Sequence, residues 1–433
     1  MNALMRLVMV PVLAGAWMSA GFAEAAPETA GAQWNVIDFG AKGDASTDNT
    51  EAFQAALDAA GEAGGGVVFA PTGRYRFEGE LSVPRHVTLR GVFAYAPAHA
   101  GVRDAHEPRP EFGTVFEPVG RRGEKEGPAF ITLQTNSVLQ GVSVHYPEQD
   151  PKGPVPAPYP FAVAMRGNNP AVIDVELLNP YQGIDASRNQ RALIRNVHGQ
   201  PLLMGIYVDQ IYDIGRIENV HWNPWWSMEE ELFQWQMENG TAFAFGRTDW
   251  HYVLNTFCFG YHVGYHFFGT EHGVANGNFL GIGADKCHTA VLVEQTARFG
   301  VLITNGEFVS FTGEEPIMVR VTDTHTGVIR FVNCAFWGPA HRIAHIAGRG
   351  TVAFSDCNFE DWGRHYGPAH AIVAEGGDLM VRGCQFHRNH PQIRLGEGVR
   401  RAIISDNLVE GRVRIENESE GQVVLRDNLG TRR

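Results

Sequence analysis

Phe331-Val332-Asn333 and Phe354-Ser355-Asp356 are two copies of one short motif, in which an apolar residue precedes Asn, Asp or Gly by two positions. A Phe usually follows three positions later. Further copies centre on Asn196, Asn219, Asn276, Asn305, Gly383, Asp406 and Asp427. These residue types tolerate the left-handed backbone region, so each copy predicts a sharp corner. From Asn276 onward the corner returns every 21 to 29 residues, which indicates a stacked solenoid.

A second motif runs in step with the first. Apolar residues recur two positions apart, as in a β-strand with one buried face. The pairs are Ile184/Ala186, Ile206/Val208, Val291/Val293, Ile317/Val319, Ile372/Ala374, Ile393/Leu395 and Val413/Ile415. Each repeat therefore holds at least two short strands and no helix, which predicts an all-β parallel β-helix with turns about 4.8 Å apart. The competing solenoid, a leucine-rich repeat, would need a Leu-x-x-Leu-x-Leu frame that is missing.

The N-terminus has the features of an export signal. Residues 1–25 combine a short basic start, an apolar stretch and small residues at the end. An uncleaved membrane anchor is the alternative. We expect residues 26–433 to form one β-helix domain that is secreted or periplasmic and free of the membrane after cleavage.

Charge and cysteines limit the partners. The net charge of −13 disfavours nucleic acid and repels a polyanionic glycan except at a local basic site. Cys334, Cys357 and Cys384 each follow a corner residue, which predicts a ladder of small buried residues in preference to disulfides. No spacing predicts a metal site, because His262 and His266 would lie about 13 Å apart on a strand.

Residues 34–91 differ from the repeats. Asp38-Phe-Gly-Ala-Lys-Gly-Asp44 opens the segment, and Asp48 with Glu51 predicts a capping box for a helix. The apolar face of that helix would comprise Phe53, Ala56, Leu57 and Ala60. Strands are expected at 67–69 and 87–91. Such a helix would cap the open end of the solenoid, whose first turn otherwise exposes core and strand edges.

This segment resembles the N-terminal signature of the pectate lyase superfamily, in its rhamnogalacturonase and epimerase-like branch. The resemblance implies a right-handed parallel β-helix and a secreted protein that acts on carbohydrate. Ala45 stands where the family usually has Gly. No catalytic residue is carried over, because the family motifs Asn-Thr-Asp, Asp-Asp, Gly-His-Gly, Arg-Ile-Lys and Asp-Pro-His are all missing.

An aromatic-rich insertion is expected at 221–268, where the spacing of the inward pairs stretches. It holds five of the nine tryptophans. Small satellite cores often use such rings, but a solenoid already has a continuous core, so the rings are also suited to a saccharide groove. Trp225, Trp226 and Trp250 are the predicted platform residues.

Counting three positions past each inward residue predicts a catalytic pair. Asp209 and Glu294 would then lie two turns apart, about 10 Å, within reach of the carboxyl spacing of an inverting glycosidase. Arg320 on the next turn would lower the pKa of Glu294 and make it the base, with Asp209 as the acid. The alternative is an exposed row of charges without catalytic function.

A second candidate cluster, 247–251, contains Arg247, Asp249, Trp250 and His251, with a simple hydrogen-bonded turn as the alternative. Lys286 is the best single base candidate for a lyase, which often also uses Ca²⁺. No cluster of Asp and Glu resembles a Ca²⁺ site, so no cofactor is predicted unless the chain is a lyase.

The predicted function is a secreted carbohydrate-active enzyme that cleaves a polysaccharide, with glycoside hydrolysis ahead of β-elimination. A non-catalytic glycan-binding or adhesion solenoid is the alternative from another class. The sequence does not indicate the polysaccharide or the oligomeric state.

Overall fold

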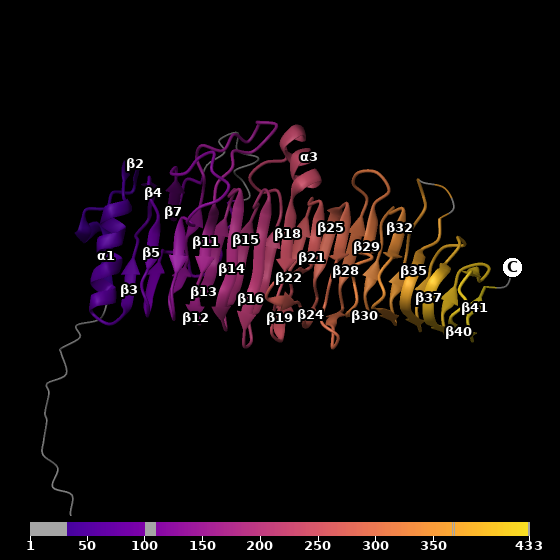
Figure 1. Ribbon diagram of the computed structural model, residues 1–433. Coiled ribbons are helices and arrows are strands. Elements are labelled where there is room, and N and C mark those ends of the chain that lie inside the picture. The colour runs from indigo at the N-terminus through magenta and orange to yellow at the C-terminus, as the bar shows by residue number, and fades with distance from the viewer. Residues whose placement is uncertain (1–32, 100–109, 366, 368, 432–433) are drawn as a thin grey trace, which may run out of the picture. The chain divides into compact units, whose positions relative to one another are not determined.

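A computed structural model describes residues 33–99, 110–365, 367 and 369–431. The predicted export signal, 1–25, lies outside these residues. Gln33–Arg433 form one compact unit. The chain coils into a parallel β-solenoid of about 15 turns (Figure 1), which confirms the predicted β-helix. None of the helices in the described part has the length and apolar composition that a membrane span requires.

Three parallel sheets run along the solenoid, and each turn contributes to all three. The first sheet contains β1 (Gln33–Asn35), β3 (Gly66–Phe69), β6 (Val87–Arg90), β9 (Val138–Gln140), β19 (His251–Leu254), β24 (Gly277–Leu280), β27 (Val301–Thr304), β30 (Val328–Val332), β33 (Thr351–Ser355) and β40 (Gln422–Arg426). The second contains β2 (Asp44–Asp48), β4 (Gly73–Phe77), β7 (Thr114–Pro118), β10 (Ser143–Val144), β20 (Phe257–Phe259), β25 (Gly283–Cys287), β28 (Glu307–Ser310), β31 (Ala335–Phe336), β34 (Asn358–Phe359), β36 (Gln385–Phe386), β38 (Leu408–Val409) and β41 (Leu429–Gly430).

The third sheet is the one that matters most for the site. It contains β5 (Leu81–Val83), β8 (Ile131–Leu133), β11 (Phe161–Met165), β14 (Gln182–Gln190), β16 (Met204–Tyr212), β18 (Thr241–Phe245), β21 (Val263–Phe267), β26 (Thr289–Val293), β29 (Ile317–Val321), β32 (Arg342–Ile346) and β39 (Ile415–Asn417).

Some strands bend from one sheet into the next. Those that join the first and second sheets are β13 (Ala171–Leu177), β15 (Leu193–Gly199) and β17 (Arg216–Trp222). Those that join the third and first sheets are β35 (Ile372–Arg382) and β37 (Ile393–Ser405). The short β12 (Gly167–Asn168) pairs with the end of β14. β22 (Gly269–Thr270) and β23 (Gly273–Val274) form an antiparallel hairpin outside the solenoid sheets.

The corner between the first and second sheets is one left-handed residue in most turns. The residues at this corner are Gly141, Asp174, Asn196, Asn219, Asn255, Gly281, Asn305, Asn333, Asp356, Gly383, Asp406 and Asp427. Their side chains also bond along the stack, as where Nδ2 of Asn333 donates to Oδ1 of Asn305 at 2.8 Å. Asn276 is a wrong prediction, since Gly281 makes that corner (φ 64°). Asn276 instead accepts from the backbone N–H of Trp250 and donates to the carbonyl of Thr248.

Two helical segments lie among the first strands, one between β1 and β2 and one between β2 and β3. η1 spans Val36–Phe39, and α1 spans Thr50–Glu62. The predicted apolar face of α1, represented by Phe53 and Leu57, is fully buried. The predicted capping box is wrong, because the N-cap of α1 is Asn49 and not Asp48. Asp48 instead accepts hydrogen bonds from Thr50 and from the backbone N–H of Glu78.

The stretch 221–268 is less irregular than predicted. β18, β19, β20 and β21 all lie within it, and each pairs with the strands of neighbouring turns. Only residues 223–240 form a long connection without strands, which joins β17 to β18 and includes α3 (Glu230–Asn239). The inward residues of β18 are Phe243 and Phe245, in register with Ile206 and Val208. Because they are aromatic and not aliphatic, the sequence pattern did not identify the turn that contains β18.

The core of the solenoid is a single continuous column of buried apolar side chains. Cys334, Cys357 and Cys384 are free, buried and stacked within it, as predicted. Because the interior is filled along its length, functional groups are restricted to the outer faces and the loops at the sheet edges.

Candidate functional site

Loops flank the third sheet on both of its edges. Residues 145–160 and 223–240 lie between the second and third sheets, and Figure 1 shows α3 and neighbouring loops rising above the strands. The β22–β23 hairpin and residues 294–300 and 322–327 lie between the third and first sheets. The first and second sheets, by contrast, share a tight corner along most of the described chain. The outer face of the third sheet is therefore a floor between two rows of loops, where functional side chains are expected.

One row of outward side chains crosses this floor, with one residue from each turn. In order of the strands it contains Asp185, Tyr207, Ala244, His266, Leu292, Arg320, His345, Val373 and Arg394. Each residue lies between two inward apolar residues, so its side chain must point away from the core. We call this row the third-sheet row.

His266 is paired with a carboxylate. Its Nε2 lies 3.1 Å from Oε1 of Glu294, although the contact does not meet hydrogen-bond geometry. Burial lowers the pKa of His266, and the negative charge of Glu294 partly opposes this effect. The imidazole is therefore neutral near pH 7 and available as a base.

Aromatic rings connect His266 to Tyr207. The Phe268 ring lies 5.0 Å from the His266 ring and stacks on Tyr207 at 6.0 Å, measured between centroids. Phe161 lies on the other side of Tyr207 at 6.5 Å. Burial raises the pKa of Tyr207, and the charges of Asp209 and Asp185 raise it further. The phenol thus keeps its proton and is a hydrogen-bond donor at neutral pH.

Cations without partners occupy the next part of the floor. Among the described residues, the guanidinium groups of Arg320 and Arg342 have no hydrogen-bond or ion-pair partner. Burial lowers the pKa of Arg342, on which Glu315 and Glu375 act only from a distance. Burial likewise lowers the pKa of His345, beside Arg320 in the row.

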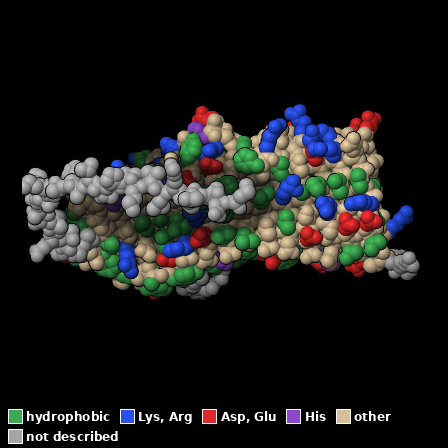
Figure 2. All heavy atoms as spheres, turned by 90° about the horizontal axis from the view of Figure 1, so that it is seen from below, with side chains coloured by type: hydrophobic (Ala, Val, Ile, Leu, Met, Phe, Trp, Pro, Cys, Tyr) green, Lys and Arg blue, Asp and Glu red, His purple; other side chains and the backbone are tan. Residues whose placement is uncertain are grey.

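Arginines nearer the C-terminus are different, because acidic side chains neutralise them. Arg394 lies 3.1 Å from Glu375 and 2.7 Å from Glu418, and Arg400 lies 3.2 Å from Asp378. Figure 2 shows basic and acidic side chains close together on the C-terminal part of the face turned away from α3. Arg320 and Arg342 thus keep an unpaired charge on the third-sheet face, whereas Arg394 in the same row does not, and unpaired guanidinium groups suit an anion.

The predicted catalytic pair is not brought together on this face. Asp209 is buried, and its Oδ1 accepts from the backbone N–H of Arg247 at 2.7 Å and from Thr270 Oγ1 at 3.0 Å. Its strand and that of Glu294 are three turns apart, since β18 supplies a turn that was counted as insertion. Three turns separate the backbones by about 14 Å, beyond the roughly 6.5–9.5 Å carboxyl spacing of an inverting glycosidase.

Arg320 also lies elsewhere than predicted. Val291 pairs with Val319, so Thr322 lies in line with Glu294, and Arg320 belongs to the row of His266. The prediction had aligned Val291 with Ile317, an error of two residues.

The remaining predicted residues scatter along the edges. The Arg247 guanidinium lies 4.0 Å from the Tyr212 ring centre, and the exposed Asp249 and Trp250 share that corner. His251 is buried, which lowers its pKa to about 3 and makes it a core residue. Lys286 lies over Phe311 at 5.0 Å, where the second sheet ends.

The two neighbouring tryptophans have different environments. Trp226 is buried with Leu178, Leu202 and Leu232 in a small core beside α3, so it cannot be a surface platform. Trp225 is half-buried, with its ring 4.8 Å from that of His221 on the second sheet.

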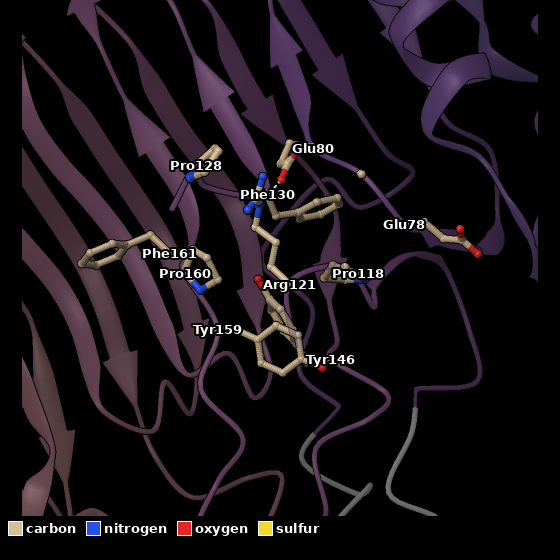
Figure 3. A pocket seen from close by; sticks show the side chains of 12 residues that line it. Glu78, Glu80, Pro118, Arg121, Pro128, Phe130, Tyr146, Tyr159, Pro160 and Phe161 are labelled. Carbon is tan, nitrogen blue, oxygen red and sulfur yellow. Dashed lines mark hydrogen bonds and ion pairs between the residues drawn. The ribbon is translucent and has the colours of Figure 1, made fainter. Parts of the chain in front are cut away.

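A small cavity near the N-terminal end of the third-sheet face is too narrow for a sugar. Figure 3 shows Arg121 reaching toward Glu80 above Tyr146 and Tyr159. Phe161, which lines the same cavity, borders the third-sheet face. The cavity measures about 20 Å³, enough for water alone. No group of three or more His, Cys, Asp or Glu side chains among the described residues is arranged to hold a metal ion.

Sequence reasoning missed Tyr207, His266 and His345 of the third-sheet row, and also Arg342, which lies outside that row. The signal was present: each row residue is the middle one of an apolar–x–apolar triplet, as in Ile206-Tyr207-Val208. Reading that middle position turn by turn requires the correct register, which the sequence alone did not provide.

Comparisons with known proteins agree with this architecture. Residues 33–103 match the family model described as "Rhamnogalacturonase A/epimerase, pectate lyase-like". Alginate lyase 7 of Azotobacter vinelandii is 62% identical over 47 residues, which are 11% of this chain and 6% of that protein. Mannuronan C5-epimerase AlgE6 of the same organism is 58% identical over 66 residues, 14% of this chain and 8% of that protein. The matches thus cover a small part of either relative.

Solved structures share the fold at low sequence identity. The catalytic unit of a GH87 α-1,3-glucanase from Streptomyces thermodiastaticus has a TM-score of 0.53 and 16% identity, over 83% of this chain and 69% of that one. Gene product 12 of bacteriophage phi29 has a TM-score of 0.56 and 14% identity, over 90% of this chain and 55% of that one. The N-terminal segment is thus similar to the pectate lyase-like family, as residues 34–91 predicted, and the chain shares the parallel β-helix fold with these structures.

Proposed function

We propose that the chain is a carbohydrate-active enzyme that cleaves a uronate-containing polysaccharide by β-elimination on the third-sheet face. The observation that carries the proposal is the row itself, in which a neutral imidazole beside a carboxylate lies two turns from an unpaired arginine. The match of the N-terminal segment to an alginate lyase and to mannuronan epimerases supports a uronate substrate. Export to the periplasm or the medium belongs to the same proposal.

The arginines have a defined task in this reaction. The proton to be removed lies next to the carboxylate of the uronate and is only weakly acidic while that carboxylate is fully charged. Arg320, with Arg342, would hold the carboxylate by charge-assisted hydrogen bonds and stabilise the negative charge that develops during proton removal. Because neither guanidinium has a protein partner, binding would break no existing ion pair.

His266 and Tyr207 would then move the protons. His266 takes the proton from C5 of the uronate, the electron pair forms the C4–C5 double bond, and the bond from C4 to the glycosidic oxygen breaks. Tyr207 gives its phenolic proton to that leaving oxygen. The backbones of these two residues are two turns apart, about 10 Å, with Phe268 touching both rings. Glu294 orients the imidazole and stabilises its protonated form.

Hydrolysis becomes the weaker alternative, because the third-sheet face lacks two carboxylates at the required separation. Asp185 is bonded to Arg166, and Glu375 is paired with Arg394. A binding protein without activity differs from both enzymes in leaving the polysaccharide intact. No described cluster can be named as a holder of Ca²⁺, so no step above involves it.

The test is an absorbance assay with polymannuronate, polyguluronate, polygalacturonate and a neutral glucan. Elimination gives a conjugated alkene that absorbs near about 235 nm, and we expect it with at least one uronate polymer and not with the glucan. His266→Ala should abolish the signal, whereas His387→Ala, a histidine of the second sheet, should leave it unchanged. Reducing ends without absorbance, or full activity of His266→Ala, would refute the proposal.

A further inference from the structure

A second hollow lies on a different face, the outer face of the second sheet. Its volume is about 460 Å³, within the range of about 300–1,000 Å³ that is typical of ligand pockets. Its lining includes Phe257, Gly283, Asp285, Asn305, Glu307 and Trp337. The mechanism proposed above uses none of these residues.

The hollow exists because one row of side chains is interrupted. Gly283 is in register between Phe257 on one neighbouring strand and Glu307 on the other. A side chain at this position would approach the Phe257 ring, since a Cβ built there lies 3.0 Å from Phe257 Cδ2. The missing side chain leaves a gap about two turns wide, with an aromatic wall on one side and a carboxylate on the other.

The chemistry of the lining differs from that of the third-sheet face. Asp285 and Glu307 contribute carboxylates, and Asn255 and Asn305 contribute amides, whereas no Lys or Arg side chain lines the hollow. Burial raises the pKa of Asp285, opposed in part by Lys286. Carboxylates and amides can both bind the hydroxyl groups of a sugar, and the carboxylates would repel a uronate.

Aromatic rings are placed at both ends. Trp337 is 43% exposed although the solenoid core is close by, so its ring face is available. On the other side, Phe257 packs against His221 at 5.0 Å, and His221 packs against Trp225 at 4.8 Å. Rings on both sides of the hollow, with the turns of Gly283 and Glu307 between them, are suited to the C–H faces of an extended saccharide.

We propose that the second sheet carries a separate binding site for a neutral, hydroxyl-rich saccharide, centred on the hollow between Phe257 and Trp337. This site goes beyond the proposed elimination, and neither depends on the other. It would bind a neutral stretch or side branch of a polysaccharide while the third-sheet face holds a uronate.

The experiment measures binding of neutral hexasaccharides (cello-, laminari-, xylo- and maltohexaose) and of hexagalacturonate to the full chain by calorimetry. At least one neutral hexasaccharide should bind. Trp337→Ala should weaken that binding about tenfold or more, and Glu307→Gln should weaken it less. Phe299→Ala, which removes an exposed ring at another edge, should leave it within about twofold.

The outcomes separate this site from the proposed enzyme. Arg320→Gln should not change the binding of the neutral sugar, and Trp337→Ala should not change the absorbance assay on short uronates. Failure of all four neutral sugars to bind, or equal losses in Trp337→Ala and Phe299→Ala at unchanged melting temperature, would overturn the inference. Tighter binding of hexagalacturonate than of every neutral sugar to Arg320→Gln would also overturn it.

Discussion

Replacing Asn333 tests the corner on which every turn depends. Asn333 has φ 51° and donates from Nδ2 to Asn305 Oδ1 at 2.8 Å. Alanine would keep the backbone in a region that costs an L-residue about 1–2 kcal/mol, and it would lose an exposed hydrogen bond worth about 0.5–1 kcal/mol. The expected destabilisation is therefore about 2 kcal/mol. Glycine relieves the backbone cost and should lose only about 1 kcal/mol.

Scanning calorimetry of the full chain can detect this difference. With an unfolding entropy of about 2.1 cal/mol/K per residue over roughly 400 residues, 2 kcal/mol lowers the melting temperature by about 2–3 °C. Asn358→Ala is the matched control, because Asn358 is exposed and its backbone is not left-handed. If Asn333→Ala were no more destabilising than Asn333→Gly, the corner would not be held by its left-handed backbone, and the reasoning would fail.

Four further predictions concern strain, protonation and substrate charge. Ala45 has φ 61°, so Ala45→Gly should raise the free energy of unfolding by about 1 kcal/mol in urea titrations. His251 is buried with a pKa of about 3, below its value in the unfolded chain, so the unfolded state binds more protons and stability should fall as pH drops from about 6.5 toward 3. His251→Leu should flatten that dependence in melting curves. Arg320→Gln should lower kcat/KM on a uronate polymer about 10- to 100-fold, whereas Arg330→Gln on the first sheet should not. The rate should fall at acidic pH as His266 gains a proton, below the usual pKa of imidazole because burial lowers it.

The fold was predictable because each corner requires a residue type that tolerates a left-handed backbone. Asn305, Asn333 and Asp356 satisfy a backbone condition that few residue types meet, and each residue marks one turn. The same rule gave a wrong corner at Asn276. This Asn is buried and forms two 2.8 Å hydrogen bonds with backbone groups, and the sequence alone does not distinguish it from an Asn at a corner. Only the neighbouring Gly281, which also tolerates a left-handed backbone, reveals the true position.

The site was less predictable because it depends on register. A shift of two residues moved Arg320 from the row of His266 to that of Glu294, and one overlooked strand, β18, changed a separation of two turns into three. Such errors leave the fold intact, since inward residues are interchangeable among Val, Ile and Phe. They scramble the outer face, where the identity of each neighbour decides the chemistry.

The two outer faces follow from the same geometry. A parallel solenoid places equivalent positions about 4.8 Å apart, so a few substitutions along one row give that face a charge of its own. The row of His266 and Arg320 has unpaired cations, and the hollow beside Phe257 has carboxylates and no cation in its lining. The net charge of the chain is −13, and this negative charge would repel a polyuronate from most of the surface. A uronate chain should therefore bind in one place, along the third-sheet face, and its affinity should fall with added salt because Arg320 and Arg342 supply the attraction. A neutral saccharide on the second sheet should show no such dependence, so the salt response alone assigns a bound sugar to its face.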